Sequence, residues 1–286
     1  METREFRIDD PDEAGRIIRG RLHLPKGSEE AGKALPYVIV CHGFKGFMDW
    51  GFFPEVCRRL VDCGIAAVPF NFSGSGVGED PLEISEDEAF FHNTPSRAVE
   101  DLDRVRGLIE SGALPGFDPN RAGLFGHSFG GATSLLHGSQ RHDYSALVVW
   151  APVGDFKKRL GDIEAWRARG FSKVPNGRTG QIHRLGVEWL EDVLGNTGKL
   201  DIVAACQRLS TPTLICHGDK DPTVSLEEGR MLYEAFAPSV ARLSVIENAG
   251  HTFGGTHPPG PIGPDLERVL GETVEIFATS LLGEPA

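Results

Sequence analysis

Apolar residues in this chain form short continuous runs separated by segments with helical spacing. Residues 37–44 (YVIVCHGF) and 65–72 (IAAVPFNF) are apolar over most of their length, which is typical of strands buried on both faces of a parallel sheet. Between them, residues 52–63 place apolar side chains at helical intervals and are followed by Gly64, a residue type that commonly ends helices. This order predicts a parallel sheet whose strands are joined by right-handed helical crossovers.

The same alternation extends through most of the chain. Alternating, β-rich patterns at residues 3–9 and 17–24 predict an antiparallel hairpin before the first parallel strand. Later strands are expected at residues 123–125, 145–153, 211–218 and 241–250, and helices at residues 96–110, 225–237 and 265–282. We therefore predict one α/β domain, residues 1–286, around a doubly wound sheet of about eight strands.

Residues 154–208 interrupt this alternation. The segment is charged, contains Trp166 and Trp189, and has no apolar run of the kind that marks the strands. Two or three short helices fit its pattern best. We therefore expect a small helical cap inserted over the sheet, and we name residues 154–208 the cap segment.

A glycine-rich turn follows the apolar residues 123–125 and precedes a small-residue segment of helical character. Its sequence is GHSFG (residues 126–130), the G-x-S-x-G pattern in its strand–turn–helix context. Glycines are needed because a serine on so sharp a turn has unfavourable backbone angles, and neighbouring Cβ atoms would collide with the strand or the helix. The turn presents the Ser128 hydroxyl beside N–H groups that can stabilise developing negative charge. Taken alone, the pattern also fits an ordinary tight turn with a surface serine.

Composition argues against several classes of function. The formal net charge is −12 and the pI is about 5.3, so nucleic acid and anionic membranes would be repelled on average. No apolar run approaches the length of a membrane span, and the charged first residues do not resemble a secretory signal. The five cysteines are odd in number and lie mostly in apolar surroundings, which is typical of free thiols in a reducing compartment. We expect a cytoplasmic protein.

Residues able to carry out chemistry occur where the predicted strands end. In an open parallel sheet these carboxyl ends meet along one edge, and ligands bind there. In chain order the residues at the ends are His42, Phe44, the loop 73–78, Ser128, Asp155, Asp219, Asp221 and His251. They include a nucleophile, acids and a base in the order Ser, Asp, His, which is the chain order of α/β-hydrolases.

From about residue 20 to residue 282 the sequence resembles the α/β-hydrolase superfamily. HGF after the first long strand, GHSFGG, HGDKDPTVS and NAGHTF look like the motifs of bacterial serine carboxylesterases. That group includes cinnamoyl and feruloyl esterases and dienelactone-hydrolase-like proteins. The resemblance implies an α/β-hydrolase fold and the hydrolysis of carboxylic esters. Dienelactone hydrolases proper use a cysteine nucleophile. The glycine-rich turn at residues 126–130, which we name the elbow, carries serine here, so their specific reaction is not implied.

A Ser-His-Asp triad follows from the resemblance. Ser128 is the expected nucleophile, and His251, in the loop after the last strand, is the expected base. Asp221 matches the acid that accepts the histidine N–H and holds its tautomer. Asp219, which could instead cap the following turn, and Asp155, after the preceding strand, are the alternatives for the acid.

Backbone N–H groups are expected to complete the site. The N–H of Phe129, directly after the nucleophile, and that of Phe44, in the loop after the first long strand, are the expected oxyanion donors. His257 is an alternative base, but it lies in a proline-rich loop with no matching family position, and His42 is interpreted as shaping the Phe44 loop. The mechanism needs no cofactor and no metal, and the ten histidines show no H-E-x-x-H or other ligand spacing.

Substrate choice is expected to depend on the cap segment. Residues 157–184 carry an excess of basic side chains, which favours anionic substrates in an acidic protein, although a solvated helical face is the simpler interpretation. Arg178, in the VPNGRTG loop, is the best candidate for a substrate contact, and Trp166 and Trp189 are candidates for lining an acyl or aromatic pocket. The expected partner is a small-molecule ester, and a homodimer is kept as an alternative to a monomer.

Two other functions stay open on the sequence alone. An aminopeptidase or acyl-peptidase would use the same triad on amides. A non-catalytic binding protein could keep the same fold.

Overall fold

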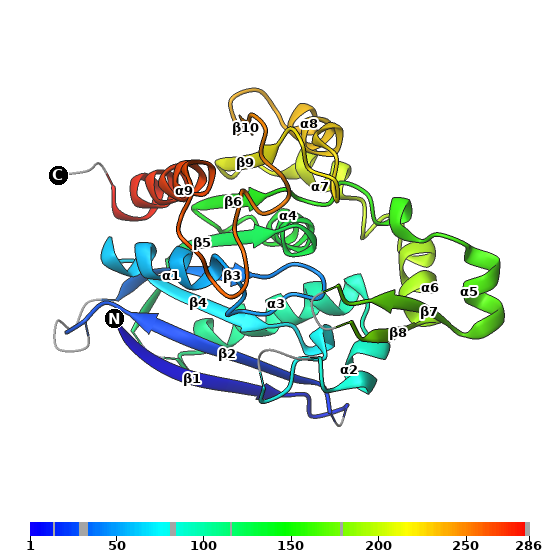
Figure 1. Cartoon of the computed structure of the whole chain (residues 1–286). Coiled ribbons are helices and arrows are strands. Elements are labelled where there is room, and N and C mark those ends of the chain that lie inside the picture. Colours follow the sequence, from blue (N-terminus) through cyan, green and yellow to red (C-terminus); the bar gives the residue numbers. More distant parts are fainter. Residues whose placement is uncertain (14, 29–33, 81–83, 115, 178–179, 284–286) are drawn as a thin grey trace.

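A mixed eight-stranded sheet forms the centre of the computed structural model (Figure 1). The structure describes residues 1–13, 15–28, 34–80, 84–114, 116–177 and 180–283. In sheet order the strands are β1 (Glu2–Asp9), β2 (Ile17–Leu24), β4 (Ala66–Asn71), β3 (Leu35–Cys41), β5 (Phe117–His127), β6 (Ala146–Trp150), β9 (Thr213–Gly218) and β10 (Ala241–Ile246). The number of strands confirms the predicted sheet.

The first two strands form the predicted antiparallel hairpin. β1 pairs with β2 along its whole length, from Glu2 opposite Leu24 to Asp9 opposite Ile17, and β2 then pairs antiparallel with β4. From β4 to β10 all neighbouring strands are parallel. The carboxyl ends of these parallel strands therefore meet at one edge of the sheet, which faces the cap segment in Figure 1.

Helices cover both faces of the sheet. On one face lie α1 (Phe53–Asp62) and α9 (Pro264–Leu282), and on the other lie α3 (Pro95–Glu110), α4 (Phe129–Arg141), α7 (Ile202–Arg208) and α8 (Leu226–Ala235). The apolar run of β3 packs against the helices on both faces. Val38 and Val40 belong to the core beneath α1 and α9, whereas Tyr37 and Ile39 belong to the core on the opposite face. Side chains alternate along a strand, so only an unbroken apolar run can serve two cores.

The cap segment lies between β6 and β9 and is more varied than predicted. Its elements are the 3-10 turn η2 (Phe156–Arg159), α5 (Ile163–Arg169), β7 (Phe171–Pro175), β8 (Ile182–Gly186), α6 (Val187–Gly195) and α7. The prediction of helices alone is incomplete, because β7 and β8 form an antiparallel pair separate from the main sheet. α7 packs against α4 and α8, so the part of the segment beyond the sheet edge runs from η2 to α6 (Figure 1). A further short helix, α2 (Asp87–Phe91), and the 3-10 turn η1 (Ser73–Ser75) lie in the connection after β4.

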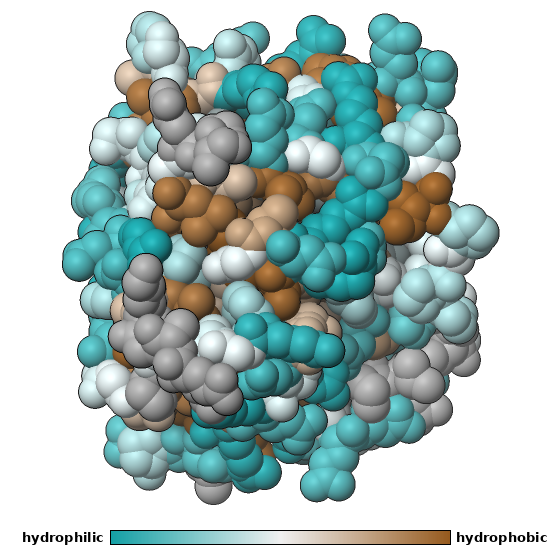
Figure 2. All heavy atoms as spheres, turned by 90° about the vertical axis from the view of Figure 1, so that its left-hand side faces the viewer, coloured by the Kyte–Doolittle hydropathy of each residue, from teal (hydrophilic) through white to brown (hydrophobic). Residues whose placement is uncertain are grey.

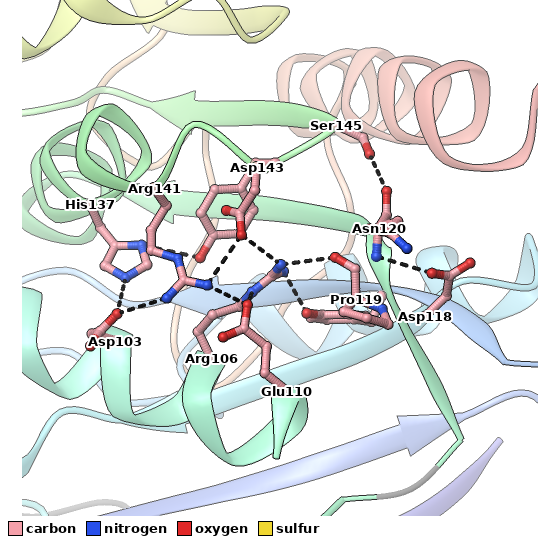
Figure 3. Close-up of polar contacts among 12 residues, drawn as sticks. Asp103, Arg106, Glu110, Asp118, Pro119, Asn120, His137, Arg141, Asp143 and Ser145 are labelled. Atoms are coloured by element: carbon pink, nitrogen blue, oxygen red, sulfur yellow. Dashed lines mark hydrogen bonds and ion pairs between the residues drawn. The ribbon is translucent and has the colours of Figure 1, made fainter. Parts of the chain in front are cut away.

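A polar network closes the end of the sheet where the strands begin (Figure 3). Arg106, on α3, is buried and donates hydrogen bonds to the Tyr37 hydroxyl (2.5 Å) and to the Pro119 carbonyl (2.9 Å), while its Nε pairs with Glu110. Burial raises the pKa of Tyr37 to about 12, so the hydroxyl keeps its proton at neutral pH. One arginine thus joins α3 to the starts of β3 and β5.

The side of the molecule away from the cap segment is mostly hydrophilic, with a hydrophobic area near its middle (Figure 2). Within the described ranges, no helix combines the length and the apolar character that crossing a bilayer would require.

Candidate active site

Ser128 occupies the turn between β5 and α4 in a conformation that few residues adopt. Its φ is 56° and its ψ is −116°. A Cβ on Gly126 would lie 2.3 Å from the Gly130 carbonyl oxygen, and a Cβ on Gly130 would lie 2.4 Å from the carbonyl oxygen of Cys41. Both positions therefore require glycine. The Ser128 N–H donates to the Trp150 carbonyl at 2.8 Å, which anchors the turn to β6.

Two loops at the same sheet edge bring an imidazole and a carboxylate together. His251 follows β10 and Asp221 follows β9, and His251 Nδ1 lies 2.7 Å from Asp221 Oδ2. Asp221 Oδ1 accepts the N–H groups of Thr223 (2.8 Å) and Val224 (3.0 Å). Burial acts to raise the pKa of Asp221, but the hydrogen bond and charge of His251 and these two N–H groups outweigh burial and lower it. The ionised carboxylate holds the proton on Nδ1, which leaves Nε2 as the basic nitrogen.

The alternative acids have other partners. Asp219 accepts the Asn248 N–H at 2.6 Å and so fixes the loop that leads to His251. Asp155 accepts the N–H of Lys157 at 2.8 Å, as the cap of η2. The structure therefore brings Asp221, and neither of these two, to His251.

The alternative histidines also hold loops in place. His257 Nδ1 accepts the N–H of Gly51 at 3.1 Å. His42 Nδ1 lies 2.8 Å from the Gly43 carbonyl oxygen, and its Nε2 accepts the N–H of Phe72 at 3.2 Å. The position of His42 agrees with its interpretation as a residue that shapes the loop after β3.

His127, immediately before Ser128, contacts the histidine loop directly. Its Nε2–H donates to the His251 carbonyl oxygen at 3.0 Å, and the two rings lie 4.6 Å apart. Phe52 and Phe53 pack against the other side of the His127 ring. Burial, with the neighbouring charge of His251, lowers the pKa of His127 to about 3. His127 is therefore a neutral donor that ties the elbow to the loop carrying His251.

A cavity of about 590 Å³ opens above Ser128, and both Ser128 and His251 line it. This volume is within the range of small-molecule sites. Trp189, from α6, packs between the side chains of Phe44 and Phe129, with ring centroids 5.1 and 5.5 Å away. These three rings and Trp166, from α5, all line the cavity. The cap segment thus supplies part of an aromatic wall facing the serine.

The loop after β3 forms a tight turn beside the serine. The Gly46 N–H donates to the Gly43 carbonyl at 2.9 Å, and Lys45 adopts a positive φ of 59°. A Cβ on Gly43 would lie 3.3 Å from Ser128 Cβ, so the turn packs directly against the elbow. Within the described part of the chain, the N–H of Phe44 donates to no acceptor. The Phe129 N–H is one of those at a helix start that no helical carbonyl accepts.

Two sequence-based expectations for the site have different outcomes. Arg178 falls outside the described residues. The loop 73–78 does not line the cavity within the described ranges. The N–H and hydroxyl of Ser73 instead donate to the buried carboxylate of Asp101.

Sequence reasoning missed several lining residues, among them Lys45, Trp50 and Phe156. The spacing of Gly43 and Gly46 in HGFKG was the available signal for the turn that carries Lys45. Within the described ranges, no group of three or more histidine, cysteine, aspartate or glutamate side chains is arranged to hold a metal ion.

Comparisons with solved structures agree on the architecture. Est1E from Butyrivibrio proteoclasticus, also solved with ferulic acid bound, matches 97% of this chain and 99% of its own at 17% identity and a TM-score of 0.69. The α/β-hydrolase GrgF from a Penicillium species matches 99% and 100% at 17% identity and a TM-score of 0.71. A dienelactone hydrolase from Anabaena variabilis matches 98% of each chain at 16% identity and a TM-score of 0.62. At these identities the likeness establishes the fold.

Comparison of sequences identifies the family. No curated protein matches the chain significantly. Residues 32–184, more than half of the chain, match the family model of the serine aminopeptidases, S33. This match and the structural neighbours confirm the resemblance to α/β-hydrolases inferred from the motifs. The chain belongs to the serine aminopeptidase (S33) family of hydrolases and has the α/β-hydrolase fold.

Proposed function

We propose that this protein is a serine carboxylesterase, with Ser128 as nucleophile, His251 as general base and Asp221 as the residue that orients His251. The observation that carries the proposal is one cavity lined both by a serine on a strained turn and by a histidine that is hydrogen-bonded to a buried carboxylate. Backbone strain of this kind is retained at functional sites, and a serine in an ordinary turn would not need it.

The reaction would proceed in two steps through an acyl-enzyme. His251 Nε2 takes the proton of the Ser128 hydroxyl as the serine oxygen attacks the ester carbonyl carbon. The bond to the alcohol oxygen then breaks, and the alcohol leaves with the proton carried by His251. Water, deprotonated by His251, cleaves the acyl–serine bond and releases the acid. Asp221 stays ionised throughout and stabilises the imidazolium.

Two backbone N–H groups would stabilise the oxyanion. Those of Phe44 and Phe129 have no acceptor within the described residues and flank Ser128 from the turn after β3 and from the start of α4. Such donors act without reorganisation because the fold has already oriented them. Trp189 packs on both phenylalanine rings and so supports both donors. We also propose that the cap segment, through Trp166 and Trp189, selects the acyl or alcohol group of the substrate.

Peptide cleavage is the second candidate, because the matching family is described as serine aminopeptidases. An aminopeptidase must bind the positively charged amino terminus of its substrate, and a carboxylate is the usual partner for that charge. Among the described residues that line the cavity, none is aspartate or glutamate, whereas three are lysine or arginine. A substrate without a free amino terminus fits this lining better, which favours the ester.

Covalent labelling and matched substrates test the proposal. A fluorophosphonate probe should label the folded wild-type protein at Ser128, and Ser128→Ala should prevent labelling. The same substitution should lower kcat on a 4-nitrophenyl ester by about 10⁴-fold or more, with an unchanged circular dichroism spectrum. If the probe does not label the folded wild-type protein, the proposal of a serine hydrolase is wrong.

Measuring the ester beside the matching 4-nitroanilide separates the two candidates. We expect hydrolysis of the ester to be much faster than that of aminoacyl anilides. The reverse preference would favour the peptidase. We also propose a cytoplasmic location, supported by five cysteines that are all free thiols in the structure.

A further inference from the structure

The cavity above Ser128 has a positively charged lining in an acidic protein. Lys45, Arg159 and Lys173 line it, and among the described lining residues there is no carboxylate. The chain as a whole has a formal net charge of −12. Because a cleft with low-dielectric walls focuses the field of the charges that line it, this lining attracts anions even though the protein is acidic overall.

The guanidinium of Arg159 is held in place by a buried carboxylate. Nη1 and Nη2 of Arg159 lie 3.1 and 2.9 Å from the two oxygens of Glu228, and Nη1 also donates to the Asp155 carbonyl at 2.8 Å. Burial acts to raise the pKa of Glu228, but the hydrogen bonds from Arg159 and from the Gly154 N–H outweigh burial and lower it. The pair is therefore ionised. These bonds use three of the five donors of the guanidinium, so Nε–H and one Nη2–H remain for a ligand.

Lys45 and Lys173 line the cavity from two different parts of the fold. Lys173 is exposed on β7 of the cap segment. Lys45 is half-buried in the turn after β3. Its Nζ donates to the Pro175 carbonyl at 2.9 Å, which joins this turn to β7 of the cap segment. Cations therefore face the cavity from the sheet side and from the cap segment.

Two buried acids beside lining residues have partners of their own. Glu228 is buried behind Arg159, and the buried Asp221 is hydrogen-bonded to His251. Neither lines the cavity. A ligand in the cavity thus meets ammonium and guanidinium groups directly, whereas the carboxylates of Glu228 and Asp221 lie outside the described lining.

We propose that the substrate is an ester that carries a carboxylate away from the scissile bond, and that Lys45, Arg159 and Lys173 bind this carboxylate. The inference rests on the proposed esterase function and adds the class of substrate. The aromatic wall formed by Phe44, Phe129, Trp166 and Trp189 contacts the apolar part of the same molecule. The carboxylate can belong to the acyl group or to the alcohol, and the chemistry that recognises it is the same in both cases.

A pair of esters that differ only in a terminal carboxylate tests the proposal. Mono-4-nitrophenyl adipate and 4-nitrophenyl hexanoate have the same leaving group and six-carbon acyl chains. We expect wild-type kcat/KM to be higher for the adipate ester and the preference to shrink from 0.1 to 1 M salt, because the Debye length falls from about 10 to about 3 Å. 4-Carboxyphenyl hexanoate beside phenyl hexanoate places the charge on the alcohol side, and the pair with the larger preference identifies the side that is recognised.

Lysine variants connect the preference to the lining. Lys173→Gln together with Lys45→Gln should lower the adipate-to-hexanoate ratio of kcat/KM by about tenfold, equal to about 1.4 kcal/mol. The hexanoate rate is the reference in this ratio, so an effect of the variant on both esters alike cancels. Lys173→Arg should retain the preference. Lys158→Gln removes the same charge from η2 outside the cavity lining and should leave the ratio unchanged.

The outcomes separate this inference from the proposed function. Equal wild-type rates on the two esters, or a preference that survives the double lysine substitution, would overturn the carboxylate proposal while the esterase stands. Loss of hydrolysis for every ester, together with no labelling of Ser128, would instead remove the esterase proposal itself. Because Lys173 is exposed, Lys173→Gln alone gives a test that does not depend on the folding of the Lys45 turn.

Discussion

The buried imidazole of His127 should make the stability of the fold depend on pH in a calculable way. In the folded protein, burial and the charge of His251 lower the pKa of His127 to about 3 from its ordinary value of 6.5. As the pH falls below 6.5, the unfolded chain takes up a proton at this position and the folded protein does not. Folding therefore loses stability over the window from pH 6.5 down to about 3.

The size of the effect follows from the two pKa values. With 6.5 in the unfolded chain and about 3 in the folded protein, His127 alone lowers the free energy of unfolding by about 2 kcal/mol at pH 5 and by almost nothing at pH 7.5. His127→Gln removes the titration and keeps an N–H donor for the His251 carbonyl. Between pH 7.5 and pH 5, the free energy of unfolding of the variant should therefore fall by about 2 kcal/mol less than that of the wild type.

Urea unfolding followed by tryptophan fluorescence at the two pH values measures this difference. Histidines that do not interact with His127 are present in both proteins, so their contributions cancel in the comparison. His142→Gln, which makes the same replacement at an exposed position, is the control for the substitution itself. If the pH dependence of His127→Gln equals that of the wild type, the ring is not held neutral by burial and the reasoning is wrong.

Two other substitutions probe the site and the elbow. Asp221→Asn should lower kcat by about 10⁴-fold in steady-state assays while the protein stays folded, because the amide cannot hold the Nδ1–H tautomer of His251; a loss below tenfold would indicate a different acid. Gly130→Ala should destabilise the fold by about 3 kcal/mol or more in thermal unfolding, because its Cβ would lie 2.4 Å from the Cys41 carbonyl oxygen. Gly107→Ala, in α3 with no atom beyond its chain neighbours and the helix backbone within 4 Å of the added Cβ, is its control and should instead stabilise by about 0.5–1 kcal/mol.

The main sheet could be predicted because its strands bury both faces. The run around Val38 and Ile39 is apolar without interruption, and few other structures require that pattern. The antiparallel pair of β7 and β8 in the cap segment has no such apolar run in its sequence. Its strands have five residues each and mostly half-buried or exposed side chains in β7, which ends at Pro175. Short strands that pair only with each other depend on the surrounding packing, which the local pattern does not encode.

The position of the acid shows where sequence reasoning ends. Asp219 and Asp221 both follow β9 at the carboxyl edge, and their spacing from the strand alone does not distinguish them; the choice of Asp221 came from the family resemblance. The difference arises in the loop, where Asp219 accepts the Asn248 N–H and Asp221 turns toward His251. The contribution of Lys45 was missed for a similar reason, because a lysine at a positive φ in a turn has no signature beyond the glycines beside it.

The positions of the first strand and the last helix in the fold have a practical consequence. β1 begins, and α9 ends, on the side of the molecule away from the cap segment (Figure 1). A surface or a reporter attached at either position would leave the mouth of the cavity facing outward. Immobilised preparations and fusions joined at these points should therefore keep substrate access, so that the ester comparisons above can be run on a sensor chip as well as in solution.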